Sequence, residues 1–289
     1  MNWMRGWIGA LSLLLLMGAR PATVQAQSPG RVVMDEMIHA FGNVLSASAR
    51  VKRTERLPDG KYIDGEMSFK AMFTPILRAY IRIQSPKEGT EVLYVEGQNG
   101  NNALINTNGF PWINVSLDPE GSTMMEKQHH SLRCLGFKFT EGVVRHIYKR
   151  HATDFDDHVL YLGEQVWSGR KVKVIKIVYN DYGKEKYTVQ GTENLCQIER
   201  KIFVPAAKIL EMNPVMDDYW DLKPGQVINV PTVYGKESVF MIDAINHMPI
   251  VQIVHDDKGL FERYEYHDLK INPRFSTTEF TKDYPDYGF

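Results

Sequence analysis

The chain is poor in cysteine. Its 289 residues contain only Cys134 and Cys196, so it is not one of the small scaffolds held together by several disulfides. An oxidising compartment would allow one bridge between them, but sequence cannot show that they lie close together. We therefore expect two small buried hydrophobic residues, with a Cys134–Cys196 bridge left open as the alternative.

An excess of one charge is also lacking. The chain has 34 Lys and Arg against 35 Asp and Glu. Removal of residues 1–26 would take away two arginines and no acids, which leaves 32 basic residues and a net charge near −3. Nucleic-acid binding requires a basic face, so no nucleic-acid partner is expected, and anionic lipid surfaces are disfavoured for the same reason.

Long hydrophobic runs are missing. The apolar stretch 8–17 is shorter than the roughly 20 residues that a membrane-spanning helix needs. It follows Arg5 and precedes Val24-Gln25-Ala26, which offers a site for signal peptidase. The pattern predicts a signal peptide over residues 1–26 and no transmembrane span. We expect a periplasmic protein, or an extracellular one if the host has no outer membrane.

Catalytic and metal-binding motifs are absent too. No His-Glu-x-x-His and no Gly-x-Ser-x-Gly occurs. His129 and His130 precede Cys134, but such a stretch is not a catalytic triad. Residues 151–158 hold two histidines and three aspartates, and we expect a solvated turn there because nothing forces these side chains to converge. We predict no enzyme, no metal and no cofactor.

The rest of the chain alternates between helical and strand spacing. Apolar residues recur at helical spacing over residues 33–45 and 139–148, which predicts two amphipathic helices. Turn residues separate short segments of alternating polarity. These segments predict strands over residues 67–73, 79–83, 91–96, 103–107, 111–117, 158–162, 166–167, 171–179, 238–242, 250–255 and 261–269. We therefore expect an α+β fold with an antiparallel sheet that a helix covers.

The strand rhythm breaks between residues 179 and 238. Tyr182-Gly183-Lys184-Glu185 recurs as Tyr234-Gly235-Lys236-Glu237, and the two copies bracket residues 187–231. Without that piece, strand 171–179 would lead into strand 238–242 through a short polar turn. Hairpin tips tolerate insertions well. We predict a host domain, residues 33–186 plus 232–289, and an inserted module over residues 187–231.

The inserted segment predicts the order strand, helix, helix, strand. Asn194 is the expected N-cap of its first helix, and Asn213-Pro214 ends its second. The segment resembles LysM domains over its whole length. The residues that carry the resemblance are Tyr187-Thr188-Val189, Leu195, Asn213-Pro214, Pro224-Gly225-Gln226 and the strand that ends at Pro231. LysM domains pair their terminal strands, which would let one fit into a hairpin.

This resemblance implies a glycan-binding groove, because LysM modules typically bind N-acetylglucosamine glycans such as peptidoglycan or chitin. On the matching positions the groove residues are Thr192, Glu193, Asn194, Asn213, Pro214, Val215 and Met216. Thr-Glu-Asn stands where the family usually has Gly-Asp-Thr, and a threonine leaves less room for a close backbone approach. A degenerate module, kept for packing or protein contact, is the alternative.

The host domain resembles the fold of the lipoprotein carrier LolA. It is more closely similar to an uncharacterised bacterial family, domain-of-unknown-function family 1571, which shares that fold. The resemblance rests on the N-terminal helix, the strand 65–73, residues 78–86, Phe240-Met241-Ile242-Asp243, Met248-Pro249, Asp257-Lys258-Gly259, Tyr264-Glu265-Tyr266 and the ending 280–289.

The LolA resemblance implies a curved antiparallel half-barrel whose apolar concave face is capped by helices. In carriers of this fold the cavity holds acyl chains. Here it would be bounded by Met124, Met125, Phe137, Phe139, Val143 and Ile147. An ordinary filled core is the alternative, because a shared fold does not fix function.

The two resemblances together indicate a non-catalytic protein of the cell envelope. Its partners would be peptidoglycan, bound by the module, and lipid or lipoprotein acyl chains, bound in the host cavity. A cell-wall hydrolase with an unrecognised site is the alternative from the enzyme class. A wall-associated scaffold with a degenerate module is the other.

Overall fold

The computed structural model describes residues 27–110 and 112–289. The predicted signal peptide and Pro111 lie outside these residues. The helices are α1 Pro29–Gly42, η1 Asn99–Asn101, α2 Ser122–Met125, η2 Leu132–Cys134, α3 Phe137–Arg150, α4 Phe155–His158, α5 Leu195–Ile202, α6 Ala206–Met212 and η3 Thr277–Phe280. The strands are β1 Ser46–Arg56, β2 Tyr62–Met72, β3 Arg78–Ser85, β4 Glu91–Val95, β5 Ala103–Asn106, β6 Asn114–Leu117, β7 Val159–Trp167, β8 Arg170–Val178, β9 Lys184–Thr188, β10 Val227–Pro231, β11 Glu237–Asp243, β12 Pro249–Asp256 and β13 Gly259–Ile271.

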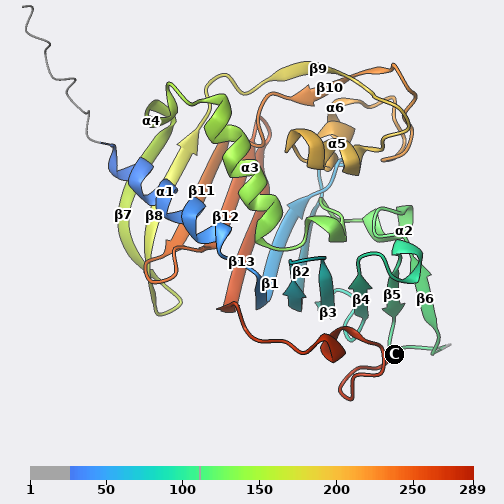
Figure 1. The fold of residues 1–289 in the computed structure, drawn as a ribbon. Helices are drawn as coiled ribbons and strands as arrows, with labels where there is room; N and C mark the ends of the chain where they lie inside the picture. Colours follow the sequence, from blue (N-terminus) through green and yellow to red (C-terminus); the bar gives the residue numbers. More distant parts are fainter. Residues whose placement is uncertain (1–26, 111) are drawn as a thin grey trace, which may run out of the picture.

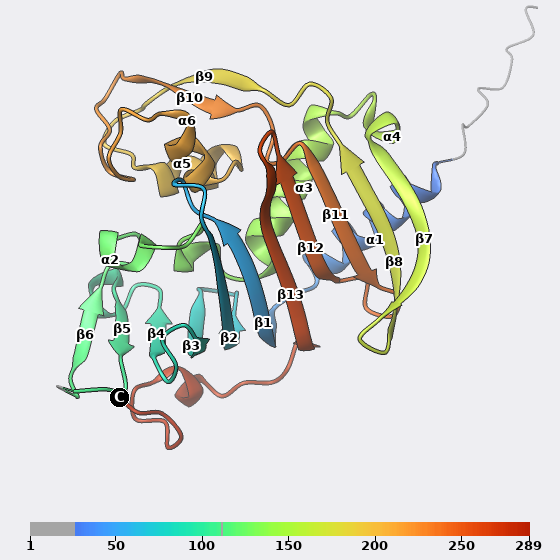
Figure 2. The same ribbon diagram turned by 180° about the vertical axis from the view of Figure 1, so that it is seen from behind.

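Eleven strands form one antiparallel sheet, called here the main sheet. Their order is β6-β5-β4-β3-β2-β1-β13-β12-β11-β8-β7. Figures 1 and 2 show this sheet twisting and bending along its length, so that one face is concave. Strands of a large sheet twist against their neighbours, which gives such curvature. The predicted α+β class and antiparallel curved sheet are confirmed.

Helices α1 and α3 cover the concave face of the main sheet (Figure 1). The Ser28 side chain caps α1 by accepting a hydrogen bond from the backbone N–H of Arg31. Its face with Met34, Met37 and Phe41 is buried. The predicted helix was too long at its end: α1 stops at Gly42, and Leu45 is exposed.

The C-terminal segment covers part of the opposite face of the main sheet. Alternate residues of a strand point to opposite faces. On β3, Ile81 belongs to the main core, whereas Tyr80 joins a small cluster with Phe280. The ring of Tyr287 stacks on Tyr80 with centroids 3.6 Å apart. The tail therefore buries apolar surface that the helices do not reach.

β1 is the strand that the sequence pattern missed. It pairs with β2 on one side and β13 on the other, in the middle of the main sheet. Its inner-facing residues begin with the small side chains Ala47, Ala49 and Val51, and its other positions are mostly basic or polar. Weak apolar alternation in the sequence hides a strand that pairing on both edges stabilises.

Residues 184–231 form a β-α-α-β unit, called here the module. Its strands β9 and β10 pair antiparallel, with Lys184 opposite Pro231 at one end and Thr188 opposite Val227 at the other. The pairing therefore begins before the predicted boundary at 187. Strands β8 and β11, on either side of the module in sequence, pair in the main sheet as predicted. The module has its own apolar cluster, which Met125 joins from outside.

A buried ion network fixes the module to the main sheet. Arg56, at the end of β1, donates to Asp256 at the end of β12, with Nη1 and Oδ1 3.0 Å apart, and to Glu211 of α6. Lys208 of α6 places its ammonium 2.7 Å from Asp256 and 2.8 Å from Glu211. These four side chains are almost wholly buried. A buried charge is tolerated only when it is paired, so the module has a defined orientation.

Candidate functional site

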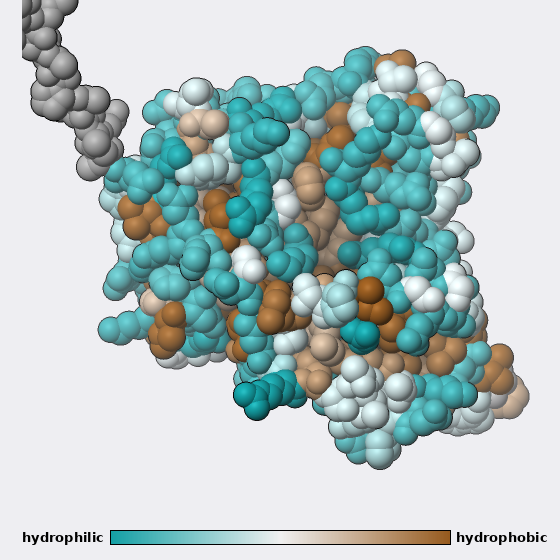
Figure 3. Space-filling model, in the orientation of Figure 1, coloured by the Kyte–Doolittle hydropathy of each residue, from teal (hydrophilic) through white to brown (hydrophobic). Residues whose placement is uncertain are grey.

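An apolar cavity of about 380 Å³ lies between the concave face of the main sheet and the segment that runs from α2 into α3. Its walls carry strand residues such as Phe69, Ile81 and Val92 on one side, with Leu132 and Phe139 on the other. In Figure 3 the middle of the molecule is hollowed, and brown and tan residues line the hollow. Well-packed interiors hold few voids larger than a water molecule.

One end of the cavity is polar, and the strand register explains why. On β1, Val51 is followed on the same face by Arg53 and Glu55. On β13 the residues directly opposite these three are Tyr266, Tyr264 and Glu262. The pairing thus sets Glu55 across from Glu262, and like charges at such positions repel one another. The site needs compensating cations.

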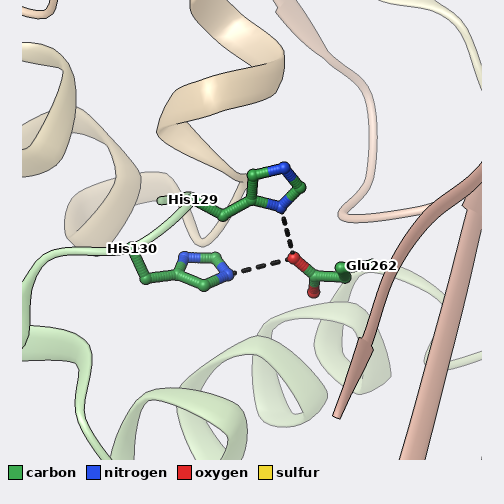
Figure 4. Close-up of side chains that lie close together, drawn as sticks. All are labelled: His129, His130 and Glu262. Carbon is green, nitrogen blue, oxygen red and sulfur yellow. Dashed lines mark hydrogen bonds and ion pairs between the residues drawn. The ribbon is translucent and has the colours of Figure 1, made fainter. Parts of the chain in front are cut away.

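His129 and His130 supply that compensation from the loop between α2 and η2. His129 Nδ1 lies 2.8 Å from Glu262 Oε2, and His130 Nε2 lies 3.2 Å from the same oxygen (Figure 4). Tyr234 donates its hydroxyl to Glu262 Oε1 at 2.6 Å. Glu55 accepts from the backbone N–H of His129 at 3.2 Å and pairs with Arg53.

The module completes this polar cluster. Glu199 of α5 is wholly buried and lies 2.6 Å from Nδ1 of His130. The thiol of Cys134 donates to the other oxygen of Glu199 at 3.6 Å. A residue from the module therefore supports a histidine at the cavity of the main sheet. Figure 4 shows the two imidazoles converging on Glu262.

The charges of the cluster shift its pKa values. Burial alone lowers the pKa of His130, but the carboxylates of Glu199 and Glu262 outweigh burial and raise it well above its usual value. The pKa of His129 is raised in the same way, by Glu55 and Glu262 against burial. Burial raises the pKa of Glu262, and the two histidines reverse this and depress it. The cluster is built to hold positive charge on its imidazole side.

Both cysteines are free and buried. Burial, followed by the charge of Glu199, raises the pKa of the Cys134 thiol, and burial raises that of Cys196 as well. The expectation of two small buried residues is confirmed, and the Cys134–Cys196 bridge does not form. A thiol with a raised pKa stays protonated near neutral pH and is a poor nucleophile.

The six residues predicted for an apolar cavity fall in four places. Met124 and Phe139 line the 380 Å³ cavity. Phe139, Val143 and Ile147 border a second hollow of about 40 Å³ under α3. Met125 packs into the apolar cluster of the module. Phe137 is fully buried in the main core, against Tyr266.

Most side chains of the first predicted glycan-binding loop form hydrogen bonds within the protein. Thr192 is exposed. Glu193 accepts from the hydroxyl of Tyr187 at 2.6 Å and from the backbone N–H of Gln190 at 2.7 Å. Asn194 caps α5 through a capping box and donates to Glu120 at 3.3 Å. Two of these three side chains therefore have structural partners.

The second predicted loop is divided between buried and exposed residues. Asn213 is buried, and its amide binds the backbone of Ile209 and Asn229 at 2.7 and 2.8 Å. Met216 belongs to the apolar cluster of the module. Pro214 is exposed, and Val215 is 85% exposed. The accessible positions of the two loops are Thr192, Pro214 and Val215.

The stretch 151–158 does converge, contrary to the sequence-based expectation. Asp154 lies 3.4 Å from His151 and 3.2 Å from His158, and the imidazole of His158 also binds the carbonyl of Val178 at 2.9 Å. The physical reason is local: α4 turns the chain so that positions 151, 154 and 158 meet. Asp154 is half exposed, so this cluster lies at the surface.

Sequence reasoning missed most of the polar cluster. Glu55 lies on the undetected strand, and Glu262 sits in an alternating strand where a charged residue is expected to face solvent. The adjacent histidines are the one signal that the sequence offers, and with Cys134 they suggest no more than an incomplete triad. On β13, Glu262 occupies the same face as the aromatic residue Tyr264, two positions along the strand. A carboxylate that alternates with aromatic residues in this way is the sequence signal that points to β13.

No helix in residues 27–110 and 112–289 is long and apolar enough to cross a bilayer. The fold and the site thus define an α+β protein with a curved antiparallel sheet, an apolar cavity and a buried polar cluster at one end of it. The chain belongs to the protein family of unknown function DUF1571, which matches residues 46–207. The match covers β1 to β8 of the main sheet and the first half of the module, and β11, β12 and β13 lie outside it.

No curated protein matches the sequence. Among solved structures, the MucA/MucB complex of Pseudomonas aeruginosa aligns with a TM-score of 0.43 and 10% identity, over 88% of this chain and 61% of that chain. A LolA superfamily protein from Nitrosomonas europaea aligns with a TM-score of 0.33 and 11% identity, over 88% and 98%. The chain thus spans about three fifths of the MucA/MucB-complex chain that it matches.

Proposed function

We propose that the protein binds a lipid or a lipoprotein acyl chain in the 380 Å³ cavity, without catalysis, in the cell envelope. The cavity itself is the observation that carries the proposal. Its volume lies within the roughly 300–1,000 Å³ of small-molecule sites, and such sites are mostly apolar with a few polar groups. An empty apolar space of this size costs stability, since its lining lacks packing partners.

The polar end favours an amphipathic ligand over a pure hydrocarbon. Arg53 offers a cation beside the apolar walls, and Tyr234 and Glu262 offer hydrogen-bonding groups. Gln252 also lines the cavity, and its amide nitrogen is buried without a hydrogen-bond partner among the described residues. A buried donor of this kind is usually satisfied, and an oxygen of a ligand head group would satisfy it.

A lipid extract of the purified protein, analysed by mass spectrometry, is the first test, followed by displacement of a fluorescent fatty acid. Ile83→Trp enlarges a cavity-lining side chain and should weaken fatty-acid binding by at least about tenfold. Ile245→Trp is the matched control, because Ile245 is 87% exposed outside the cavity. Equal affinity in both variants, or an extract free of lipid, would overturn the proposal.

We infer a second role for the module, as a LysM-type domain that binds peptidoglycan. The β-α-α-β order with paired end strands supports this reading. The exposed Thr192, Pro214 and Val215 would form the contact, whereas Glu193, Asn194, Asn213 and Met216 would shape it from beneath. The competing interpretation is a module that only packs against the main sheet. The buried ion pair of Lys208 with Asp256 supports such a packing role beside glycan binding.

Sedimentation of the full chain with insoluble peptidoglycan tests this second role. Val215→Asp places a charge in the contact and should reduce the bound fraction at least severalfold. Val166→Asp, at a 71% exposed position of β7, is the matched control. If neither the native chain nor the control sediments above background, the module does not bind peptidoglycan.

We also propose that the protein has no catalytic activity. A wall hydrolase with an unrecognised site would clear a band in a peptidoglycan zymogram, and a scaffold would retain a partner protein through purification. We expect a blank zymogram. Export through a signal peptide over residues 1–26 would place the protein where both lipid carriers and peptidoglycan occur, and N-terminal sequencing of the secreted protein tests that step.

A further inference from the structure

The two histidines of the polar cluster present their nitrogens as metal ligands do. His129 Nδ1 and His130 Nε2 both point at one oxygen of Glu262, at 2.8 and 3.2 Å (Figure 4). One ligand atom from each of the three residues lies within 4.8 Å of the others. Tetrahedral bonds of about 2.0–2.1 Å to zinc would set two ligand atoms roughly 3.3 Å apart. Small shifts of these side chains would open that spacing.

The second ring nitrogens have the partners that metal-bound histidines use. His129 Nε2 lies 2.8 Å from the carbonyl oxygen of Arg56, and His130 Nδ1 lies 2.6 Å from the carboxylate of Glu199. A metal-bound histidine almost always donates its other N–H to a carbonyl or a carboxylate, which fixes the ring and its tautomer. Here both outer partners are in place, and Glu199 is fully buried.

These contacts leave each imidazole facing acceptors on both sides. A divalent cation at that point would take the place of the hydrogen bonds to Glu262. Its charge would be balanced by the buried carboxylates of Glu55, Glu199 and Glu262, and a buried charge is stable when it is paired or coordinated in this way.

We propose that His129 Nδ1, His130 Nε2 and Glu262 Oε2 bind a divalent transition metal ion of the zinc type. The Tyr234 hydroxyl, 2.9 Å from His130 Nε2 and 2.6 Å from Glu262, lies beside the fourth position. His130, Glu262 and Tyr234 line the apolar cavity, so that position opens onto the cavity. Two imidazoles and one carboxylate suit zinc or a related ion rather than Ca²⁺ or Mg²⁺, which prefer oxygen ligands.

The other convergent group lacks this support. His151, Asp154 and His158 also lie within reach of one another, but Asp154 is half exposed and Nε2 of His151 has no partner in the described part of the chain. His158 has an outer partner in the carbonyl of Val178, but His151 has none among the described residues, so only one of the two imidazoles is held in place. This group serves as the internal control for the proposed site.

Zinc titration of the chelator-treated full chain tests the proposal. We expect one equivalent to bind, and X-ray absorption at the zinc edge to show two imidazoles and only nitrogen or oxygen ligands at about 2.0–2.1 Å. Mg²⁺ should not compete. His130→Gln, which keeps an amide near Glu199, should weaken zinc binding by at least about 100-fold, and Glu199→Gln by about 10–100-fold.

The control is the double variant His151→Gln/His158→Gln, which should bind zinc as the native chain does. Saturable binding that survives in folded His130→Gln but is lost in the double variant would overturn the proposal, as would the absence of any saturable zinc. If His130→Gln does not fold, as judged by circular dichroism, the absorption spectrum of the native chain and the double variant decide. A spectrum with fewer than two imidazoles contradicts the site.

Discussion

Single buried charged residues hold the module in a fixed position against the main sheet. Asp256 accepts from both Arg56 and Lys208 within the ion network. Burial alone would raise the pKa of Asp256, but these hydrogen bonds outweigh it and hold the pKa at about 2. The folded-state pKa is therefore below the ordinary value of about 3.9. One carboxylate thus links β1, β12 and α6.

Asp256→Asn should lower the free energy of unfolding by about 3 kcal/mol, because it leaves Arg56 and Lys208 buried with less negative charge. In the native chain this stabilisation is complete above about pH 4 and is lost as pH falls towards 2, since the depressed pKa belongs to the folded state. Urea unfolding at pH 7 and pH 3 measures both effects. Asp268→Asn, at an exposed position, is the control. A pH dependence that is the same in both variants would contradict this assignment.

Helices α3 and α5 are held close by a glycine. Gly142 lies on α3, and a Cβ atom there would collide with the ring of Phe203, the left-handed C-cap residue of α5. A side chain at position 142 would push α5 away from α3. Because α5 also carries Glu199, such a shift would reach His130 and the polar cluster.

Gly142→Ala should therefore destabilise the protein by about 1–3 kcal/mol through overpacking, although alanine favours a helix over glycine. Gly42→Ala tests the helix effect alone: Gly42 ends α1, and its nearest neighbour to an added Cβ is Arg145 at 3.9 Å. It should be neutral or slightly stabilising. Thermal unfolding of both variants gives the comparison. A loss of stability in Gly42→Ala as large as that in Gly142→Ala would show that packing against Phe203 is not the cause.

At the scale of the whole molecule, the question is how far the module and the main sheet depend on each other. They have separate apolar clusters, and β8 and β11 pair directly with each other rather than with the module. Yet Lys208 and Glu211 of the module pair with buried charges of the main sheet, and Glu199 pairs with His130 of the loop between α2 and η2. The chain enters and leaves the module between two paired strands, so the module could be removed without breaking the main sheet. Its buried charges, however, are paired with charges outside the module.

Replacement of residues 185–230 by Asn-Gly, a favoured two-residue hairpin turn, should leave the main sheet folded but less stable. We expect a loss on the order of 3–5 kcal/mol, because His130 and Arg56 lose buried partners. Circular dichroism reports the fold and chemical denaturation the loss. The same replacement in an Arg56→Met/Asp256→Leu background should lose less. Stability equal to that of the full chain would show that docking contributes nothing, and complete unfolding would show one inseparable unit.

The sequence by itself determined the features that depend on local spacing. Helical periodicity located α1 and α3, alternation located most strands, and turn residues set their limits. The repeat around residues 187–231 predicted the pairing of β8 with β11. Each of these follows from neighbours a few residues apart, where side-chain pattern and backbone geometry are directly linked.

The tertiary structure alone decided β1, the cavity and the polar cluster. β1 has a weak apolar pattern and forms because β2 and β13 both pair with it. Glu55 and Glu262 meet through strand register, and His130 meets Glu199 through the docking of the module, across 207 and 69 residues of sequence. Contacts of that range arise from how elements pack together, and no local pattern of residues encodes them.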